Sequence, residues 1–566
     1  MRNKHWRIES PLTSAADIEL QDYPLIIRQV LFNRGYATKE SAGHYMRAEP
    51  TSDTSPWRLI GMRETVDRVQ DALLHNEPIV VYGDYDVDGV TATALLVQTL
   101  RTLGGDAHEY IPNRFDEGYG INNEALKTLY DNGIRLIISV DCGIRSPGEA
   151  AYAHELGLDL IITDHHQPAQ DLPEAFAIIN PKQPGDLYPD KELAGVGVAY
   201  KLAEALLETL QSDFDKSQLL DLVALGTVAD LAPLTGENRS LVRQGLKCIQ
   251  TTKRQGLFSL ANVADMNITT TSATNIGFVL GPRLNAAGRL ESALASFELL
   301  ITQDIMRAGQ LALQLDKNNR DRQALTRQIQ EQAEAIVMAE DPNADLLFAV
   351  HPDFNTGVVG LAASRLSEIF YRPAIVGQNS DETTRCSCRS IPEFHITQAL
   401  DQCADLLVRH GGHAAAAGFT VTNDNLPELK NRLKIIAKKE LEGKELRQTL
   451  TADGEIRLVD LKPELLKFLS ALQPTGYGNP DAVFVSRGVK IKTSRTVGAE
   501  GKHLKLTVND GNITFDAIGF RLGHLQPELP VEKKMDLMYT FETNEFNGRT
   551  YLQLNLKDVK KSGTPD

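Results

Sequence analysis

The feature that most constrains the fold of this chain is the segment Val80-Val81-Tyr82-Gly83-Asp84-Tyr85-Asp86-Val87-Asp88-Gly89-Val90-Thr91. A short apolar run ends in three carboxylates at alternating positions, and a helix-compatible run from Thr91 to Leu100 follows. This order predicts a buried strand, a tight turn permitted by Gly89 and the start of a helix. Three aspartates that converge in such a turn repel one another unless cations lie between them, and oxygen-rich sites suit Mg²⁺ or Mn²⁺. A solvated acidic turn or a calcium-type loop is the alternative that this segment alone leaves open.

Size and composition narrow the class of protein. A chain of 566 residues has room for about two to four domains, and its 42% hydrophobic content is ordinary for a soluble globular protein. The basic N-terminus has no apolar run behind it, and no run reaches the about 18 apolar residues of a membrane span. Five scattered cysteines fit reduced thiols, so we expect a cytoplasmic protein. A net charge of -16 argues against general adhesion to nucleic acid but leaves room for a local basic channel.

Between about residues 52 and 235, short apolar runs alternate with helical patterns, which predicts a parallel sheet with helices on its faces. The expected strands are Ile79–Tyr82, Leu136–Val140, Leu160–Ile162 and Ala177–Ile179.

Acids and imidazoles follow the ends of these elements. Asp141 follows the second strand, Asp164-His165-His166 the third, and Asp230 a later helical run over 220–228. Each taken singly is more typical of a cap, a turn or a surface pair. Because ligands of parallel sheets lie outside the carboxyl ends of the strands, together they indicate one site.

The second half of the chain contains three further patterns. Residues 302–341 form a long polar helical stretch, which predicts either a connecting helix or an ordinary packed one. Residues 343–440 return to α/β patterning, and Gly411-Gly412-His413 within them is either a turn or a place where backbone N–H groups approach an anion. Residues 450–561 are strand-rich and predict a small OB-type barrel that binds single strands or only braces other domains.

Taken in order, these segments resemble the motifs of the DHH phosphoesterase superfamily and of its single-strand exonuclease branch. The resemblance rests on six stretches, namely Asp84-Tyr85-Asp86-Val87-Asp88-Gly89, Asp141, Asp164-His165-His166, Asp230, Arg283-Leu284-Asn285-Ala286-Ala287-Gly288-Arg289 and Gly411-Gly412-His413-Ala414-Ala415-Ala416-Ala417-Gly418. The last stretch is similar to the signature of the associated DHHA1 domain. The resemblance covers about residues 50 to 560.

It implies an α/β protein with a parallel-sheet DHH domain, a long connecting helix, a second α/β DHHA1 domain and a C-terminal OB-type β-barrel. The expected boundaries are 1–50 for an N-terminal helical segment, 51–301 for the DHH catalytic domain, 302–341 for the connecting helix, 342–445 for the DHHA1 substrate-binding domain and 446–566 for the OB-type nucleic-acid-binding domain.

The resemblance also implies a centre of two ions, Mn²⁺ or Mg²⁺, with Asp141 as the bridging carboxylate. We expect Asp84 and Asp88 to complete one ion site, with Asp88 the least secure ligand, and Asp86, His165 and Asp230 to complete the other. Asp164 is expected to orient a histidine, and His166 to contact phosphate or donate a proton. Oxygen-dominated ligation with one imidazole suits these metals better than zinc.

The resemblance also implies which residues contact the substrate. Arg114, Ser387 and Arg389 resemble positions of a 5′-phosphate pocket, Arg283 and Asn285 resemble contacts to the scissile region, and Gly411, Gly412 and His413 a phosphate contact. Each arginine alone is equally typical of a surface salt bridge. Two departures are present: Cys386 and Cys388 stand where the family has glycines, which suggests a different local loop, and Asn355 stands where it has a histidine, which keeps a hydrogen-bond contact but not proton transfer.

The function implied is a single-stranded-DNA-specific 5′-to-3′ exonuclease that releases 5′-mononucleotides in DNA repair and recombination. By resemblance its partners are single-stranded DNA, a single-strand-binding protein and a helicase, and the protein is expected to be a monomer with no membrane association. One alternative is a phosphodiesterase acting on short RNA, cyclic dinucleotides or polyphosphate. Another is a catalytically silent single-strand-binding replication subunit, although such relatives lose metal ligands that this chain keeps.

Overall fold

The computed structural model describes residues 4–113, 117–118, 120–290, 292–341, 343–546 and 549–564. The chain folds into two compact units. The large unit contains residues 4–284, 293–312 and 449–566, and the small unit contains residues 285–292 and 313–448. Among the helices of the described residues, none combines the length and apolar character needed to cross a membrane.

The large unit contains the predicted parallel sheet, with strand order β3-β2-β4-β5-β6. The strands are β2 (Ile79–Gly83), β3 (Ala107–Tyr110), β4 (Leu136–Val140), β5 (Asp159–Thr163) and β6 (Ala177–Ile179). Every pairing is parallel, and β2 and β4 are buried throughout, as expected for strands covered on both faces. The edge strand β3 was not predicted, because its sequence, Ala-His-Glu-Tyr, has no apolar run.

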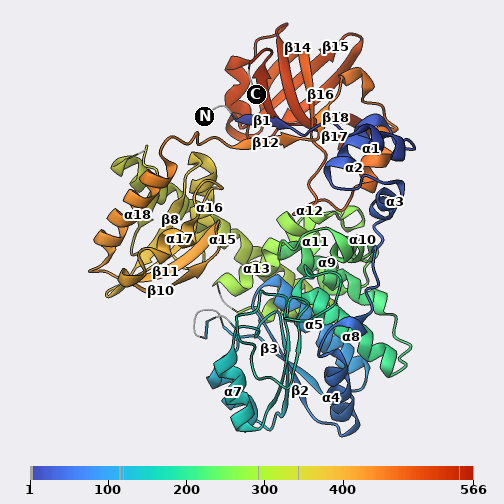
Figure 1. Ribbon diagram of the computed structural model, residues 1–566, viewed down its shortest axis with the longest axis vertical. Helices are drawn as coiled ribbons and strands as arrows, with labels where there is room; N and C mark the ends of the chain where they lie inside the picture. The colour runs from blue at the N-terminus through green and yellow to red at the C-terminus, as the bar shows by residue number, and fades with distance from the viewer. Residues whose placement is uncertain are drawn as a thin grey trace. The chain divides into compact units, whose positions relative to one another are not determined.

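Helices cover both faces of this sheet (Figure 1). On one face α6 (Asn123–Asp131) and α7 (Pro147–Leu156) share an apolar cluster with β2, β4 and β5. On the other lie α4 (Met62–Leu74), α5 (Val87–Thr102) and α8 (Gly195–Thr209). The remaining helices of this region are α9 (Leu220–Ala229), α10 (Gly236–Gln250), α11 (Gln255–Val263), α12 (Ala273–Asn275), α13 (Gly281–Leu290) and α14 (Leu294–Ile301). The helix α9 packs on α5, α8 and α10 and therefore brings its C-terminus to the same edge as the strand ends.

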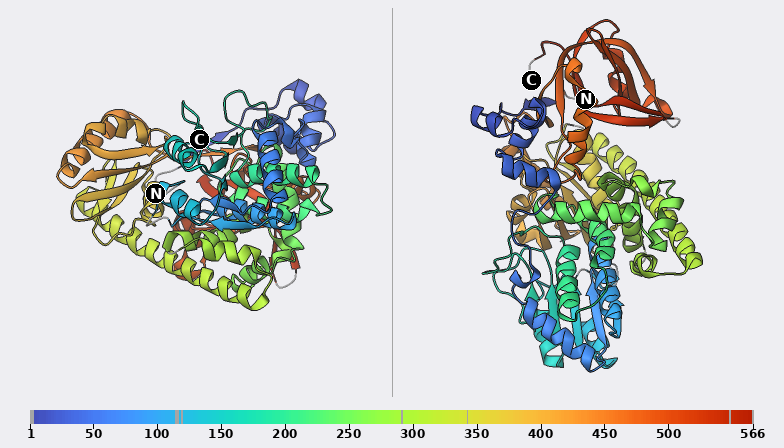
Figure 2. Two further views of the ribbon diagram at one scale, coloured as in Figure 1. Left: turned by 90° about the horizontal axis from the view of Figure 1, so that it is seen from below. Right: turned by 90° about the vertical axis from the view of Figure 1, so that its right-hand side faces the viewer.

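The C-terminal part of the large unit is the expected barrel. Its strands are β14 (Phe484–Val497), β15 (His503–Asp510), β16 (Ile513–Gly519), β17 (Lys534–Phe546) and β18 (Arg549–Lys561). Pairing of β14 with β17 closes the five strands on themselves, and Figure 2 shows the strands wrapping round a common centre. The strand β17 was not predicted from the sequence.

The N-terminal segment packs into the core of this barrel. The helices α2 (Leu25–Asn33) and α3 (Lys39–Arg47) contribute buried residues to a cluster with α19 (Leu465–Ala471) and the barrel strands, and Leu20, which follows α1 (Ser14–Glu19), joins it. Ahead of them β1 (His5–Ile8) pairs in parallel with β12 (Thr449–Ala452), and β13 (Gly454–Glu455) pairs with β14.

The small unit contains a mixed sheet with the order β10-β11-β9-β8-β7. Its strands are β7 (Leu347–Val350), β8 (Ala374–Asn379), β9 (Thr383–Arg389), β10 (Leu407–Gly412) and β11 (Ala416–Thr422). One face packs on α16 (Val359–Phe370), and the other on α17 (Ile396–Asp401) and α18 (Leu426–Leu441).

The long helix α15 (Ile305–Glu340) runs unbroken for 36 residues and fills most of the predicted stretch 302–341. The expected architecture, an α/β protein with a parallel-sheet domain, a long helix, a second α/β domain and a C-terminal closed β-barrel, is therefore confirmed.

Candidate metal centre

The three aspartates of the opening motif lie in the turn from β2 to α5. Asp86 is the N-cap of α5, and its Oδ1 atom accepts hydrogen bonds from the backbone N–H groups of Asp88 at 2.9 Å and Gly89 at 3.1 Å. A Cβ atom on Gly89 would lie 2.5 Å from the carbonyl oxygen of Asp84, so only glycine permits this turn. Asp84 and Asp86 therefore precede the helix, whereas Asp88 lies in its first turn.

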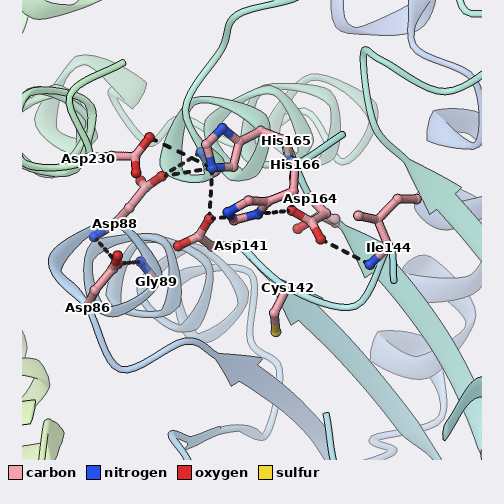
Figure 3. Close-up of polar contacts among 12 residues, drawn as sticks. Asp86, Asp88, Gly89, Asp141, Cys142, Ile144, Asp164, His165, His166 and Asp230 are labelled. Carbon is pink, nitrogen blue, oxygen red and sulfur yellow. Dashed lines mark hydrogen bonds and ion pairs between the residues drawn. The ribbon is translucent and has the colours of Figure 1, made fainter. Parts of the chain in front are cut away.

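Three other elements bring polar side chains to this turn (Figure 3). Asp141 follows β4, His165 follows β5, and Asp230 is the C-cap of α9. The Nε2 atom of His165 lies 3.1 Å from Asp141 Oδ1 and 3.8 Å from both Asp88 Oδ2 and Asp230 Oδ2. All six residues predicted as metal ligands thus belong to one cluster at the carboxyl edge of the sheet.

The structure divides these ligands differently from the sequence-based prediction. Groups whose ligand atoms lie within 4.8 Å of one another are Asp84 with Asp86 and Asp141, Asp88 with His165 and Asp230, and Asp141 with His165 and His166. The predicted sets, Asp84 with Asp88 and Asp86 with His165 and Asp230, differ from these groups, because α5 begins between Asp86 and Asp88. Asp141 and His165 each occur in two of the groups, and the bridging role of Asp141 stays a prediction.

The N-terminus of α8 supports this cluster, and sequence reasoning missed it. Both carboxylate oxygens of Asp88 accept backbone N–H bonds, from Gly195 at 2.7 Å and from Val196 at 2.8 Å. A Cβ atom on Gly195 would lie 2.7 Å from Asp141 Oδ1, so the helix approaches both aspartates only through glycine. The signal in the sequence is Gly195-Val196-Gly197 at the start of an apolar helix.

Burial makes the charged form of this cluster costly without a counter-ion. Burial first, and then the neighbouring aspartates, raise the pKa of Asp141 and of Asp88 well above the ordinary value. The same two causes raise the pKa of Asp230 to about 7. Buried Asp141 Oδ1 and His165 Nε2 make no hydrogen bond within the described residues. Carboxylate oxygens with one imidazole nitrogen are a donor set that fits Mn²⁺ or Mg²⁺.

The two histidines of the motif differ in charge and partner. Burial, and then the charge of His166, lowers the pKa of His165 to about 3, so its ring is the neutral form that binds metals. Burial also lowers the pKa of His166, but the hydrogen bond and charge of Asp164 outweigh it and raise the pKa. His166 Nδ1 lies 2.8 Å from Asp164 Oδ1. The histidine whose ring Asp164 contacts is thus His166.

Asp164 is held by several backbone donors. Its Oδ1 atom accepts from the N–H groups of His165 and His166, and its Oδ2 atom accepts from Ile144 at 3.0 Å. Burial raises the pKa of Asp164, but these bonds and His166 outweigh it and lower the pKa overall. Protein groups therefore supply hydrogen bonds to both carboxylate oxygens of Asp164, whereas Asp141 Oδ1 accepts none within the described residues.

The predicted substrate residues of the small unit lie on or beside β9, β10 and α16. A Cβ atom on Gly360, in the first turn of α16, would lie 3.3 Å from Arg389 Nη2 and 3.5 Å from Ser387 Oγ, so both side chains point toward this helix start. Asn355 Oδ1 accepts from the N–H of Gly357 at 2.8 Å and so shapes the turn before α16.

One local expectation about this unit is wrong. Residues 383–389 form the regular strand β9 and not a loop, and Cys386 and Cys388 point into the apolar core, on the face of the sheet opposite Ser387 and Arg389. Gly411 and Gly412 end the edge strand β10, which pairs with β11, and their contact to a phosphate stays a prediction. His413 is exposed, and its N–H donates to the carbonyl of Ala416 at 2.7 Å.

The remaining three predicted substrate residues do not lie beside β9, β10 or α16. Arg283 and Asn285 lie on α13, where Arg283 Nη1 donates to the carbonyl of Val279 at 2.8 Å. Arg114 lies outside the described residues.

Three family models match the chain. The DHH family N-terminal domain matches residues 78–227, the DHHA1 domain residues 343–439 and the RecJ OB domain residues 452–558.

Curated relatives match over nearly the whole chain. The single-stranded-DNA-specific exonuclease RecJ of Bacillus subtilis is 38% identical, over 98% of this chain and 71% of the relative. The protein of the same name from Dickeya dadantii is 36% identical, over 96% of this chain and 97% of the relative.

Solved structures agree in fold. Crystal structures of RecJ from Thermus thermophilus in complex with Mn²⁺ and with Mg²⁺ superpose with TM-scores of 0.86 and 0.80 at 29% and 28% identity. They cover 100% of this chain and 81% and 80% of those chains.

Proposed function

Because the chain belongs to the RecJ exonuclease family within the DHH superfamily, we propose that it is a metal-dependent exonuclease specific for single-stranded DNA. It degrades strands from the 5′ end, releases 5′-mononucleotides and acts in DNA repair and recombination. The observation that carries the chemistry is the convergence of five aspartates and His165 at one sheet edge. The direction of degradation and the product rest on the resemblance of the motifs.

The metal of this proposal is Mn²⁺ or Mg²⁺, two ions per site. Asp84, Asp86 and Asp141 would hold one ion, and Asp88, His165 and Asp230 would hold the other, with Asp141 also placed beside His165. When bound, two such ions supply an activated water and stabilise both oxygens of an in-line displacement. The buried Asp141 Oδ1 and the neutral His165 ring support this assignment.

The other residues of the large-unit site position the substrate strand or donate a proton to it. His166, held at 2.8 Å by Asp164, contacts the scissile phosphate or donates a proton to the leaving oxygen. Asp164 is a positioning residue, because its carboxylate contacts His166 and backbone N–H groups. Arg283 and Asn285 contact the strand near the scissile bond.

Residues of the small unit bind the 5′ end of the strand. Ser387 and Arg389, which both point toward the start of α16, bind the terminal phosphate together with Arg114. Asn355, Gly411, Gly412 and His413 are further contacts to this phosphate.

The domain boundaries given above, 51–301, 342–445 and 446–566, are part of this proposal and agree in order with the three family models. A single-strand-binding protein and a helicase as partners, a monomeric state and a cytoplasmic location belong to it by resemblance.

A product assay tests the proposal. Single-stranded DNA labelled at the 5′ end, a 3′-labelled copy and a duplex are each incubated with the protein and Mn²⁺. We expect immediate release of labelled mononucleotide from the 5′ label only, with the duplex spared. Release first from the 3′ label would contradict the direction, and hydrolysis of dinucleotides alone would favour the small-phosphodiester alternative.

Variants connect this activity to the metal centre. The double variant Asp86→Ala/His165→Ala should lose at least about 100-fold in rate, because it removes one ligand from each ion site. The matched control is Asp131→Ala/His154→Ala, which alters the same residue types at exposed positions of α6 and α7. Wild-type degradation by the first variant would overturn the assignment of the centre.

A further inference from the structure

The face of the small-unit sheet that packs on α16 is exposed further along, at Arg385 on β9 and at Arg409 and Gly411 on β10. On β9, Cys386 and Cys388 point into the core under α17 and α18, so the alternate residues Arg385, Ser387 and Arg389 point to the opposite face. On β11, Phe419 and Val421 point into the same core, and Gly418 and Thr420 therefore share the face of the arginines.

Strand register arranges this face in two rows. Ser387, Gly418 and Gly411 are neighbours across the three strands, and this row has a side chain only at Ser387. The next row is Arg385, Thr420 and Arg409. It lies two residues further along the strands, about 7 Å from the first row.

The second row forms a cationic hollow. Arg385, Thr420 and Arg409 line a cavity of about 300 Å³ together with Gly411 and Gly418. Arg409 Nε donates to Thr420 Oγ1 at 3.3 Å, which holds this guanidinium over the middle strand. Both arginines are exposed, while Thr420 beneath them is buried.

Within the described residues, neither Arg385 nor Arg409 forms an ion pair with a carboxylate. Other arginines of this unit do, for example Arg365 with Glu368 and Arg432 with Asp405. Asp401, a nearby acid, lies 2.8 Å from the Nε2 atom of His410, which points to the other face. Two guanidinium groups that share a hollow without a counter-charge, in a chain of net charge -16, indicate a site for an external anion.

We propose that Arg385, Thr420 and Arg409 form a subsite for an internal phosphodiester of the bound strand. The proposal rests on the proposed function and extends it by one contact beyond the terminal-phosphate residues Ser387 and Arg389. The glycines of the first row let the strand backbone pass close to the sheet between the two contacts. The guanidinium groups would bind phosphate oxygens and not bases, so this subsite would accept a strand of any nucleotide sequence.

The test is equilibrium binding of a fluorescent oligo-dT strand in EDTA buffer at several NaCl concentrations, where the proposed metal-dependent hydrolysis does not run. The double variant Arg385→Gln/Arg409→Gln should bind about tenfold more weakly at low salt. The slope of log affinity against log salt should fall by about 0.7, since a single strand loses about 0.7 for each phosphate contact and the subsite holds one phosphodiester. The matched control is Lys438→Gln/Lys439→Gln, which removes two exposed charges from α18 on the opposite side of the sheet.

A second set of measurements distinguishes binding of an internal phosphodiester from binding of the 5′-terminal phosphate. The loss of binding should be equal for 5′-phosphorylated and 5′-hydroxyl strands. A loss confined to the 5′-phosphorylated strand would assign the arginines to the terminal phosphate and overturn the subsite. An unchanged slope in the variant, with wild-type binding intact, would also overturn it. Absence of single-strand binding and degradation by the wild type would instead overturn the proposed function itself.

Discussion

At the residue scale, two aspartates of one site illustrate how environment decides role. Asp141 and Asp164 are both fully buried, yet the pKa of Asp141 is raised and that of Asp164 is lowered. The difference arises because Asp164 accepts hydrogen bonds from three backbone N–H groups and faces His166, whereas Asp141 Oδ1 has no such donor. A cation is therefore expected at Asp141 and a held imidazole at Asp164.

This contrast predicts the behaviour of Asp164→Asn. The maximal rate should fall about 10–100-fold, because His166 loses the carboxylate that orients it, while Mn²⁺ affinity measured by calorimetry should change far less. Combining the change with His166→Ala should cost little more than His166→Ala alone, because both act through one hydrogen bond. Fully additive losses, or loss of Mn²⁺ binding in Asp164→Asn, would show that Asp164 acts on the metal centre directly.

At the element scale, the start of α8 organises the centre from outside the sheet. Its backbone N–H groups bind Asp88, and its first glycine lies against Asp141. The same helix is tied to α10 further along by Lys201, whose Nζ atom lies 2.8 Å from both Glu204 and Glu237. One helix therefore combines a functional contact at its N-terminus with a buried ion pair that fixes its position.

The glycine contact predicts a difference between two neighbouring substitutions. Gly195→Ala should reduce Mn²⁺ affinity about 10–100-fold, because a Cβ atom there would lie 2.7 Å from Asp141 Oδ1 and displace that carboxylate. Gly197→Ala is the matched control, since its Cβ atom meets Leu193 at an ordinary 3.4 Å. Isothermal titration of both variants checks this, and equal affinities would contradict the packing described.

The buried pair predicts a pH-dependent loss of stability. Lys201 is 3% exposed, so Lys201→Met should destabilise the large unit by about 3–5 kcal/mol at pH 7, because Glu237 loses its counter-charge. At Glu237 burial raises the pKa and Lys201 offsets it only in part, whereas at Glu204 Lys201 and Lys216 outweigh burial and lower the pKa below the ordinary 4.5. A lowered carboxyl pKa contributes stability that is present above about pH 4.5 and lost as the pH falls below it.

The deficit of the variant should therefore shrink below pH 4.5. Calorimetric melting of wild type and variant at pH 7 and pH 4 measures it. Lys216→Met, at an exposed partner of the same Glu204, is the control and should cost less than about 1 kcal/mol. A deficit that stayed constant with pH would indicate that packing, and not charge, holds α8 to α10.

At the scale of the whole molecule, the N-terminal segment and the C-terminal barrel form one core. Strand β1 pairs with β12 across more than 440 residues of sequence, and the buried Ile27, Val30 and Leu31 of α2 share a cluster with barrel strands. The segment that the sequence marked as a separate helical piece therefore stabilises the OB-type barrel.

Two leucines of α2 test this. Leu31→Ala, at a side chain with 0% exposure, should cost about 2–5 kcal/mol and increase hydrogen exchange in β14–β18. Leu25→Ala, on the same helix but 65% exposed, should change stability by less than about 0.5 kcal/mol. Exchange that increased only within α1–α3 would contradict a shared core.

The sequence by itself determined the parallel sheet, the long helix, the barrel and the identity of the acidic cluster. Strands β2, β4 and β6 and helix α9 follow closely from local hydrophobic runs, because apolar patterning is a property of neighbouring residues. The short polar β3 and the glycine-rich β10 lack such runs, so only pairing with their neighbours makes them strands.

The tertiary structure alone decided how the cluster is divided. Which carboxylates face one another depends on where α5 begins and on α8, which lies more than 100 residues from Asp88 and caps its carboxylate. It also decided that Arg385 and Arg409, 24 positions apart, share one hollow, because strand register sets cross-strand neighbours. Such contacts arise from packing between distant segments. A local pattern such as Gly195-Val196-Gly197 can indicate a close approach, but it does not predict which residue is approached.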